Sequence, residues 1–390
     1  MSVEQESLDL HRRLRGKIGT LVKTPISSRR DLSLAYTPGV AEPCRQINQK
    51  PEAVYTYTNI GNTVAVITDG TAVLGLGDIG AQAGLPVMEG KCVLFKEFAD
   101  IDAFPIALNT KETQEIITTI KNIAPSFGGI NLEDISAPRC FEIETALKEE
   151  LDIPVFHDDQ HGTAIVVLAA LINALKITGK KKEEIRILIN GVGAAGTAIA
   201  KILFNFGVKQ LTVLDSRGVI YTGRDNLNLA KEDLITLIDK DNKSTKGSLA
   251  EAIKGQDVFI GVSSANILTI DMVKAMSKDP IIFALANPVP EIMPDQALKA
   301  GARIVGTGRS DFPNQVNNVL AFPGVFKGTL AVRARSITEG MKLVAAQALA
   351  EYISKPTEVQ ILPDPLDKGV AEAVAEKVSA QAILEGVARQ

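Results

Sequence analysis

Acidic side chains gather in three short segments, each after an apolar, strand-like run. The segments are TDG with Asp69, NLEDI with Glu133 and Asp134, and FHDDQH with Asp158 and Asp159. Enzymes with α/β folds place their chemistry at the carboxyl ends of strands. Hard divalent cations such as Mg²⁺ and Mn²⁺ prefer oxygen ligands of this kind. Any one of these residues, taken alone, reads as a helix N-cap or turn former, so the metal-site hypothesis rests on their grouping.

The segment FHDDQH also contains two histidines four residues apart, His157 and His161. This spacing resembles half of a zinc-protease motif, which requires both histidines on one helix and a glutamate after the first. An aspartate follows His157, and that histidine ends the strand-like run DIPVF. We therefore interpret the pair as local hydrogen-bonding groups and do not predict zinc.

Three further residue types could take part in proton transfer or substrate contact. Tyr36 precedes a Pro-Gly turn, so its phenol need not be buried, although most tyrosines simply pack with a satisfied hydroxyl. Lys91 opens an apolar run that we interpret as a strand, where a lowered pKa would allow it to act as a base. The commoner lysine buries its stem and keeps its ammonium group in water. Asn287 and the pair Asn317–Asn318 follow apolar segments and, alone, would be read as turn residues.

The pattern Gly-x-Gly-x-x-Gly occurs twice, at 75–80 and 191–196. It indicates a dinucleotide site only as a strand, a glycine turn, a helix and an acidic residue about 20 positions later. The second copy has all four parts, because IRILIN precedes it, an apolar helical run follows, and Asp215 lies 19 residues after Gly196. Its glycines let the backbone approach a pyrophosphate, whose charge the helix N-terminus favours. The predicted cofactor-binding residues are Gly191, Gly193, Ala194, Ala195, Gly196 and Asp215.

Asp215 would accept the ribose hydroxyls and repel a 2′-phosphate, which favours NAD. Arg217 could pair with that phosphate, so NADP remains an alternative. The first glycine copy is predicted to be a tight turn, because Gly84 and Pro86 should cut short any helix after it. Asp78 within the turn would also oppose a pyrophosphate.

The elements that position these residues read as an α/β fold. Strand-like runs alternate with helical periodicity from about 105 to 275, which indicates parallel sheets. The runs that read as strands are GGINLEDI, DIPVF, IRILIN, QLTVLD, DVFIGVS, PIIFALANP and RIVGTG. We predict an N-terminal α/β catalytic domain (1–160), a Rossmann-like doubly wound NAD-binding domain (161–345) and a C-terminal helical segment (346–390).

The bulk properties of the 390-residue chain narrow the classes of partner. The net charge is −4 with no basic block, so no nucleic acid is expected. The apolar run 163–177 is too short to span a membrane and reads as a buried helix. The N-terminus lacks a signal-peptide core, and Cys44, Cys92 and Cys140 are isolated. We therefore expect reduced thiols, a cytoplasmic location and no membrane partner.

Taken together, the segments resemble the malic enzyme family, and the compact length is similar to its short prokaryotic branch. The motifs occur in the family's order, from the N-terminus to about residue 330. They are YTPGVAEPC, ITDGTAVLGLGDIGAQAGLPVMEGK, NLEDI, FHDDQHGTA, GVGAAG, VLDSRG, ALANP and NNVLAFPG. The resemblance implies oxidation of L-malate with NAD(P)⁺ and Mg²⁺ or Mn²⁺, followed by decarboxylation to pyruvate and CO₂. It also implies a homodimer.

The resemblance carries residue roles with it. It implies Glu133, Asp134 and Asp159 as metal ligands. Lys91 would be the base for the C2 hydroxyl, with Asp158 as support for that base, and Tyr36 would be the acid that protonates C3. Asn318 would contact the substrate, and Asn287 would contact both substrate and cofactor. Longer members carry an arginine before the LGLG turn, where this chain has Ala72 and Val73. Lys96 is the candidate replacement cation. A malolactic or oxaloacetate-decarboxylating relative, and more distantly a non-catalytic NAD sensor, remain as alternatives.

Overall fold

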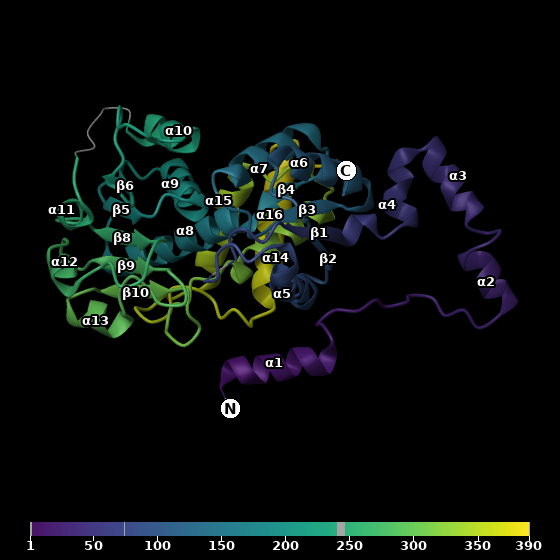
Figure 1. The fold of residues 1–390 in the computed structure, drawn as a ribbon, viewed down its shortest axis with the longest axis horizontal. Coiled ribbons are helices and arrows are strands. Elements are labelled where there is room, and N and C mark those ends of the chain that lie inside the picture. Colours follow the sequence, from purple (N-terminus) through teal and green to yellow (C-terminus); the bar gives the residue numbers. More distant parts are fainter. Residues whose placement is uncertain (1, 74, 240–245, 390) are drawn as a thin grey trace.

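The computed structural model describes residues 2–73, 75–239 and 246–389, and is built around two mainly parallel sheets with helices on their faces (Figure 1). The first sheet has the order β2-β1-β3-β4 and the second the order β10-β9-β8-β5-β6-β7. Every pairing is parallel except the one between β6 and the two-residue β7. The α/β prediction is confirmed.

The first sheet places all three acidic segments at the same edge. Its strands are β1 (Thr63–Thr68), β2 (Asp102–Ala107), β3 (Gly129–Leu132) and β4 (Val155–His157). Val64 and Val66 of β1 pack with α5 (Ala81–Ala99), while the alternate residues of β1 pack with α6 (Thr113–Ile123) and α7 (Arg139–Glu150). Because successive side chains point to opposite faces, both faces of β1 are buried. The parallel register brings the ends of β1, β3 and β4 together.

The second sheet is doubly wound. Its strands are β5 (Arg186–Asn190), β6 (Gln210–Asp215), β7 (Gly218–Val219), β8 (Val258–Gly261), β9 (Ile281–Ala284) and β10 (Ile304–Thr307). The order runs from β5 to β6 in one direction and from β5 to β8 in the other, which creates a switch point at the carboxyl edge. The helices around this sheet include α9 (Ala194–Phe206), α10 (Leu229–Ile238), α11 (Leu249–Ala252), α12 (Ile270–Lys274) and α13 (Pro294–Lys299).

A long apolar helix, α8 (Asp158–Thr178), connects the two sheets. It packs against α9 and α15 (Glu339–Tyr352), and α14 (Phe322–Ala331) and α16 (Gly369–Leu384) complete this central layer. By length and composition α8 could cross a membrane, but 67% of its apolar stretch is buried inside the fold. It is the buried helix predicted for 163–177. The predicted domain boundaries at 160 and 345 fall inside α8 and α15, and the division into three parts stays a proposal.

The helix α5 contradicts one prediction from sequence. Gly84 and Pro86 do not end it, because it runs for 19 residues with Pro86 inside. A helix-interior proline costs about 3 kcal/mol. Burial of one large apolar side chain returns roughly 1.5–3 kcal/mol, and α5 buries Met88, Phe95 and others. Lys91 therefore lies on a helix and not on the predicted strand.

Residues 2–59 form an arm that extends away from the rest of the molecule (Figure 1). It contains α1 (Val3–Leu14), α2 (Arg29–Ala35), α3 (Ala41–Gln49) and α4 (Val54–Tyr57). None of its described residues, 2–59, is buried, and Ile60 is the first buried residue in the part of the chain that the structure describes. Figure 1 shows α2 and α3 at the outer end of the arm.

Candidate active site

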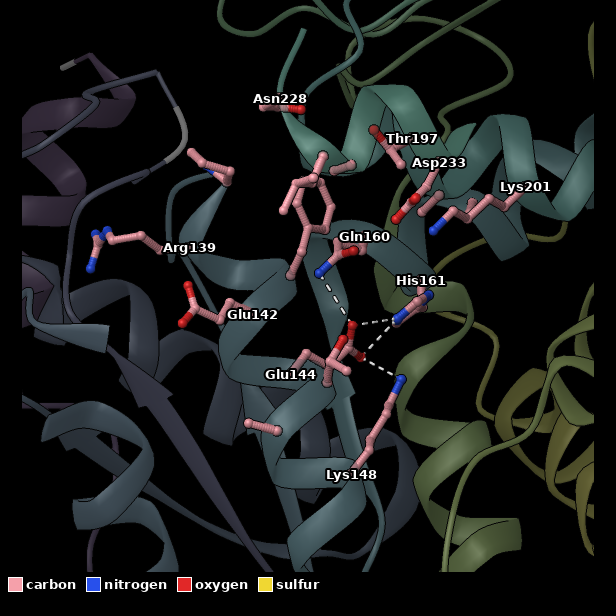
Figure 2. Close-up of a pocket in the computed structure, with 18 of the residues that line it drawn as sticks. Arg139, Glu142, Glu144, Lys148, Gln160, His161, Thr197, Lys201, Asn228 and Asp233 are labelled. Carbon is pink, nitrogen blue, oxygen red and sulfur yellow. Dashed lines mark hydrogen bonds and ion pairs between the residues drawn. The ribbon is translucent and has the colours of Figure 1, made fainter. Parts of the chain in front are cut away.

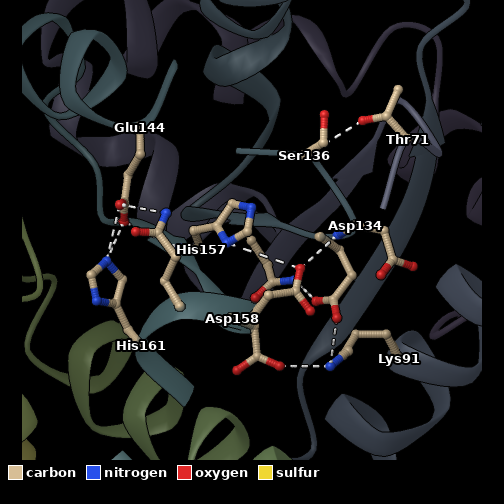
Figure 3. Close-up of polar contacts among 12 residues, drawn as sticks. Thr71, Lys91, Asp134, Ser136, Glu144, His157, Asp158 and His161 are labelled. Carbon is tan, nitrogen blue, oxygen red and sulfur yellow. Dashed lines mark hydrogen bonds and ion pairs between the residues drawn. The ribbon is translucent and has the colours of Figure 1, made fainter. Parts of the chain in front are cut away.

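Three carboxylates meet where β3 and β4 end. Figure 3 shows one of them, Asp134, together with Asp158 and Lys91. Glu133 and Asp134 follow β3, and Asp159 lies in the first turn of α8. One oxygen from each of the three lies within 4.8 Å of the other two. Asp134 adopts a left-handed conformation (φ 54°), and its backbone N–H donates to Asp159 Oδ2 at 2.8 Å. The parallel sheet thus brings together the three predicted metal ligands.

The cluster has the chemistry of a site for a hard cation. Asp134 Oδ2 is buried and has no hydrogen-bond partner among the described residues, which is unusual for a buried polar atom. Burial raises the pKa of Asp134 to about 9, with further contributions from the charges of Asp159 and Glu133. Burial likewise raises the pKa of Asp159 to about 6. A divalent ion would supply the positive charge that these crowded carboxylates need, so the residues fit such a group.

Lys91 projects from the buried side of α5 into the same cluster. Its Nζ lies 2.6 Å from Asp158 Oδ2 and 2.9 Å from Glu133 Oε1, and 4.4 Å from the centre of the Phe322 ring. Burial alone would lower the pKa of Lys91, but the charges of Asp158 and Glu133 outweigh burial and raise it. The sequence-based expectation of a lowered pKa therefore fails for this arrangement of protein groups. Lys91 is a buried cation held between two carboxylates.

Asp158 depends on a glycine one turn further along α8. A Cβ added at Gly162 would lie 1.9 Å from Asp158 Oδ1, so any other residue would displace this carboxylate. Asp158 Oδ1 is buried without a partner among the described residues, while Oδ2 accepts from Lys91. The carboxylate is thus turned toward Lys91 by its surroundings.

A second polar network holds the start of α8, and sequence analysis missed it (Figure 2). Glu144 of α7 accepts from the backbone N–H of His157 at 3.2 Å and from Gln160 Nε2 at 3.3 Å. Its carboxylate also lies 2.8 Å from His161 Nε2 and 2.7 Å from Lys148 Nζ. The network borders a cavity of about 930 Å³ between α7, α9, α10 and α15, on whose lining none of the three clustered carboxylates lies.

The two histidines of HDDQH behave differently. Burial lowers the pKa of His161 to about 4, so its ring is neutral near pH 7. Its Nε2 faces a carboxylate and its Nδ1 lies 3.2 Å from Lys342 Nζ, which assigns the proton to Nε2. This confirms a local hydrogen-bonding role for His161. His157 departs from that prediction, since neither ring nitrogen has a hydrogen-bond partner among the described residues.

Two charged residues considered from sequence lie apart from the cluster. Asp69 follows β1 and pairs with Arg139 at 2.8 Å, so it is engaged elsewhere. Lys96 is half exposed and pairs with Asp100, the C-cap residue of α5, and with Asp102 of β2. Five residues along a helix turn a side chain well away from Lys91, so the expectation that Lys96 replaces the missing arginine is wrong.

The second glycine motif forms a turn between β5 and α9. Gly191 has φ +105° and would place a Cβ 2.5 Å from the Val262 carbonyl oxygen. A Cβ at Gly196 would lie 1.9 Å from the Gly191 oxygen, so the close approach of helix and turn requires glycine. Gly193 is the N-cap residue, and Ala194 and Ala195 begin α9. The free N-terminus of this helix lies at the carboxyl edge of the sheet, where it favours an anionic pyrophosphate.

Asp215 ends β6 as predicted, but two cations already engage it. Each carboxylate oxygen accepts from Arg224 Nη2 at 2.7 Å, and Oδ2 lies 2.7 Å from Lys231 Nζ. Burial would raise its pKa, but the hydrogen bonds from these two side chains lower it to about 2. Arg217 donates its backbone N–H to Oδ1 at 2.9 Å. The carboxylate is therefore ionised with its charge offset, a feature that sequence analysis missed.

The remaining predicted residues divide into two near the site and one far from it. Asn318 begins a short 3₁₀ helix (Asn318–Leu320), and its Cβ lies 3.1 Å from the Cβ position of Gly162. The Asn287–Pro288 segment approaches the Gly75 turn, with the Asn287 oxygen 3.7 Å from the Cβ position of that glycine. Tyr36, by contrast, is 66% exposed at the end of α2 on the N-terminal arm. The structure does not bring Tyr36 to Lys91 of the same chain.

Comparisons with known proteins identify the same family for both halves of the chain. Residues 15–117 and 109–148 match the malic enzyme N-terminal domain, and residues 160–383 match the malic enzyme NAD-binding domain. The Bacillus subtilis bifunctional malic/malolactic enzyme is 56% identical over 392 residues, which cover 100% of this chain and 95% of that protein. The Geobacillus stearothermophilus NAD-dependent malic enzyme is 55% identical, with coverage of 96% and 78%. Other matching relatives are NADP-dependent malic enzymes.

A solved structure supports the same relationship. The crystal structure of malic enzyme from Pyrococcus horikoshii Ot3 has a TM-score of 0.96 and 48% sequence identity, covering 100% of this chain and 92% of that one. The shared fold thus accompanies high identity over full length. The chain belongs to the malic enzyme family and carries its nicotinamide-nucleotide-binding domain.

Proposed function

We propose that this chain oxidises L-malate with a nicotinamide nucleotide and a divalent metal, then decarboxylates the product to pyruvate and CO₂. The observation that carries the proposal is the placement of Lys91 between Asp158 and Glu133, beside the three clustered carboxylates. A buried base next to a cation site suits the removal of a hydroxyl proton from a bound hydroxy acid.

Each chain residue has a task that its position supports. Glu133, Asp134 and Asp159 would hold Mg²⁺ or Mn²⁺. When bound, the ion supplies charge that stabilises negative charge on the C2 oxygen. Asp158 and Glu133 hold Lys91 Nζ in place, where the ammonium group must first lose a proton. The positive charges of a bound ion and of an oxidised nicotinamide would lower the pKa of Lys91, so that the neutral amine could take the C2 hydroxyl proton. Asn318 lies beside the first turn of α8, where it would orient substrate.

We propose NAD as the main nucleotide and NADP as a tolerated one. The turn at 191–196 would bind the pyrophosphate, with Asn287 near the nicotinamide end. The Asp215 carboxylate at the end of β6 supports NAD, because a ribose hydroxyl could replace one of the four hydrogen bonds that its two oxygens now accept. Arg224 and Lys231 offset its charge, which weakens its repulsion of a 2′-phosphate. The preference for NAD is therefore expected to be modest.

The test is NADH absorbance with L-malate, NAD⁺ and Mn²⁺, repeated with NADP⁺ and with EDTA. We expect NADH formation that EDTA abolishes, and slower turnover with NADP⁺. Because one similar protein is named a malic/malolactic enzyme, lactate is measured beside pyruvate. Malate consumption that yields lactate without free NADH would favour the malolactic alternative. CO₂ release from oxaloacetate without any malate oxidation would instead identify a decarboxylase.

A further inference from the structure

The N-terminal arm is folded although none of its described residues, 2–59, is buried. Ser28 caps α2 by accepting from the Asp31 backbone N–H at 3.1 Å, and Asp31 accepts from Ser27 at 3.0 Å. After α2, the backbone N–H of Gly39 donates to the Ser33 carbonyl at 2.8 Å and fixes the Tyr36 turn. These local bonds give the segment a defined shape without tertiary burial.

The arm exposes an unusual amount of apolar surface. Among the described residues, 13 of 24 exposed large hydrophobic side chains lie in the first 59 positions. They include Leu21 (87% exposed), Val22 (75%), Leu32 (49%) and Leu34 (65%). A monomeric protein rarely leaves apolar side chains this concentrated in water, so the arm has the character of an interface.

The charge of the arm fits a second copy of the same chain. Residues 1–59 contain nine Lys and Arg and six Asp and Glu, while residues 60–390 contain 33 and 40. The arm thus carries a net charge of +3 and the rest of the chain −7. Opposite charges on two surfaces favour their association and set its orientation.

The arm contacts α5, the helix that carries Lys91, through Lys17. The Lys17 backbone N–H donates to Glu89 at 2.8 Å, and Lys17 Nζ donates to the Pro86 carbonyl at 2.7 Å, both on α5. Between Tyr36 and the first buried residue, Ile60, lies α3, which at 1.5 Å per residue is about 13 Å long. Figure 1 shows α2, whose C-cap residue is Tyr36, at the outer part of the arm.

We propose that Tyr36 acts in the active site of a second copy of this chain, whose arm in turn supplies Tyr36 to the first. This inference rests on the proposed function and on the family resemblance, which implies Tyr36 as the acid that protonates C3 of the enol product. A two-fold axis makes the exchange reciprocal, since each arm covers the partner's body and buries its own apolar side chains. Each active site then takes Lys91 and the carboxylates from one protomer and Tyr36 from the other.

The test pairs two inactive variants. Tyr36→Phe and Lys91→Ala chains carry different affinity tags, are co-expressed, and the heterodimer is isolated by tandem purification. One of its two sites has both lesions and the other has none, so we expect about half of wild-type malate oxidation from it and below about 1% from either homodimer. A Lys91→Ala/Asp159→Ala heterodimer is the matched control and should stay inactive, because these residues belong to one protomer's site.

The outcomes separate the two proposals. A Tyr36→Phe/Lys91→Ala heterodimer as inactive as its parents would overturn the exchange, since every site would then contain one lesion. A fully active Tyr36→Phe homodimer, or a monomeric wild-type chain in solution, would also overturn it. Failure of the wild-type chain to oxidise malate would instead overturn the proposed function.

Discussion

Replacing Asp134 by Asn should change the free energy of unfolding in opposite directions with and without metal. At 4.8 Å, two unit charges in an effective dielectric of about 20 repel by roughly 3.5 kcal/mol. Together with burial, this repulsion raises the pKa of Asp134 to about 9, so at pH 7 the folded protein must protonate a carboxyl group that is ionised in the unfolded chain. That proton uptake lowers the stability of the wild type in EDTA, and asparagine does not require it. We therefore expect the variant to be about 1–3 kcal/mol more stable than wild type in EDTA. The left-handed backbone at 134 is no obstacle, because asparagine tolerates that conformation.

Metal should reverse the order. With free Mn²⁺ at about 1,000 times its Kd, the wild type gains about 4.1 kcal/mol, which exceeds the 1–3 kcal/mol advantage of the variant in EDTA. The amide introduced by Asp134→Asn offers a single neutral oxygen in place of a carboxylate, so the variant should gain little. Chemical or thermal unfolding of both proteins in EDTA and in Mn²⁺ measures the crossing.

The control is Asp100→Asn, because Asp100 has nearly the same backbone conformation (φ 55°) but lies 83% exposed and paired with Lys96. Loss of this surface ion pair should cost about 0–1 kcal/mol, equally in EDTA and in Mn²⁺. The reasoning is refuted if Asp134→Asn destabilises the protein in EDTA, or if Mn²⁺ leaves the wild type unchanged.

Three further predictions follow from the same geometry. Lys91→Ala should lower malate oxidation by about 10²–10⁴-fold with little change in NADH affinity, measured by NADH fluorescence; undiminished turnover would contradict its role. Gly196→Ala should abolish nucleotide binding in the same titration, because its Cβ would meet the Gly191 oxygen at 1.9 Å. Mn²⁺ affinity should rise from pH 6 to 9, since protons held by Asp159 (pKa about 6) and Asp134 (pKa about 9) compete with the ion. Calorimetry in buffers of different ionisation enthalpy should show proton release at pH 7, and pH-independent affinity would oppose this assignment.

The metal cluster and the glycine turn could be anticipated because local sequence and sheet topology determine both. Parallel strands end at one edge, so acidic residues after β3 and β4 must lie close together. Likewise, the close packing of strand, turn and helix in this motif requires glycine at fixed positions, and Gly191 and Gly196 occupy them. These predictions needed no knowledge of distant contacts.

The failures came from contacts between distant segments. The prediction that Gly84 and Pro86 end the helix considered only their local helix propensity. Burial of α5 against the sheet and α14 stabilises the helix by more than these two residues destabilise it. Glu144 resembles an ordinary charge in a surface helix. Its one available signal was its position on the same helix face as Cys140 and Leu147, both buried. Nothing in the segment YTPGVAEPC predicts that Tyr36 lies on an exposed arm.

The charges in the buried cluster explain why Lys91 alone cannot complete it. Four carboxylates, Glu133, Asp134, Asp158 and Asp159, face one ammonium group, and Lys91 contacts only Glu133 and Asp158 among them at ion-pair distance. Asp134 and Asp159 are left to share one backbone hydrogen bond, with Asp134 Oδ2 unpartnered among the described residues. Buried carboxylates in this state are costly unless a cation joins them. A divalent ion held by Glu133, Asp134 and Asp159 would leave Lys91 with Asp158, so the two cations would divide the four carboxylates and Lys91 would be free to face the substrate.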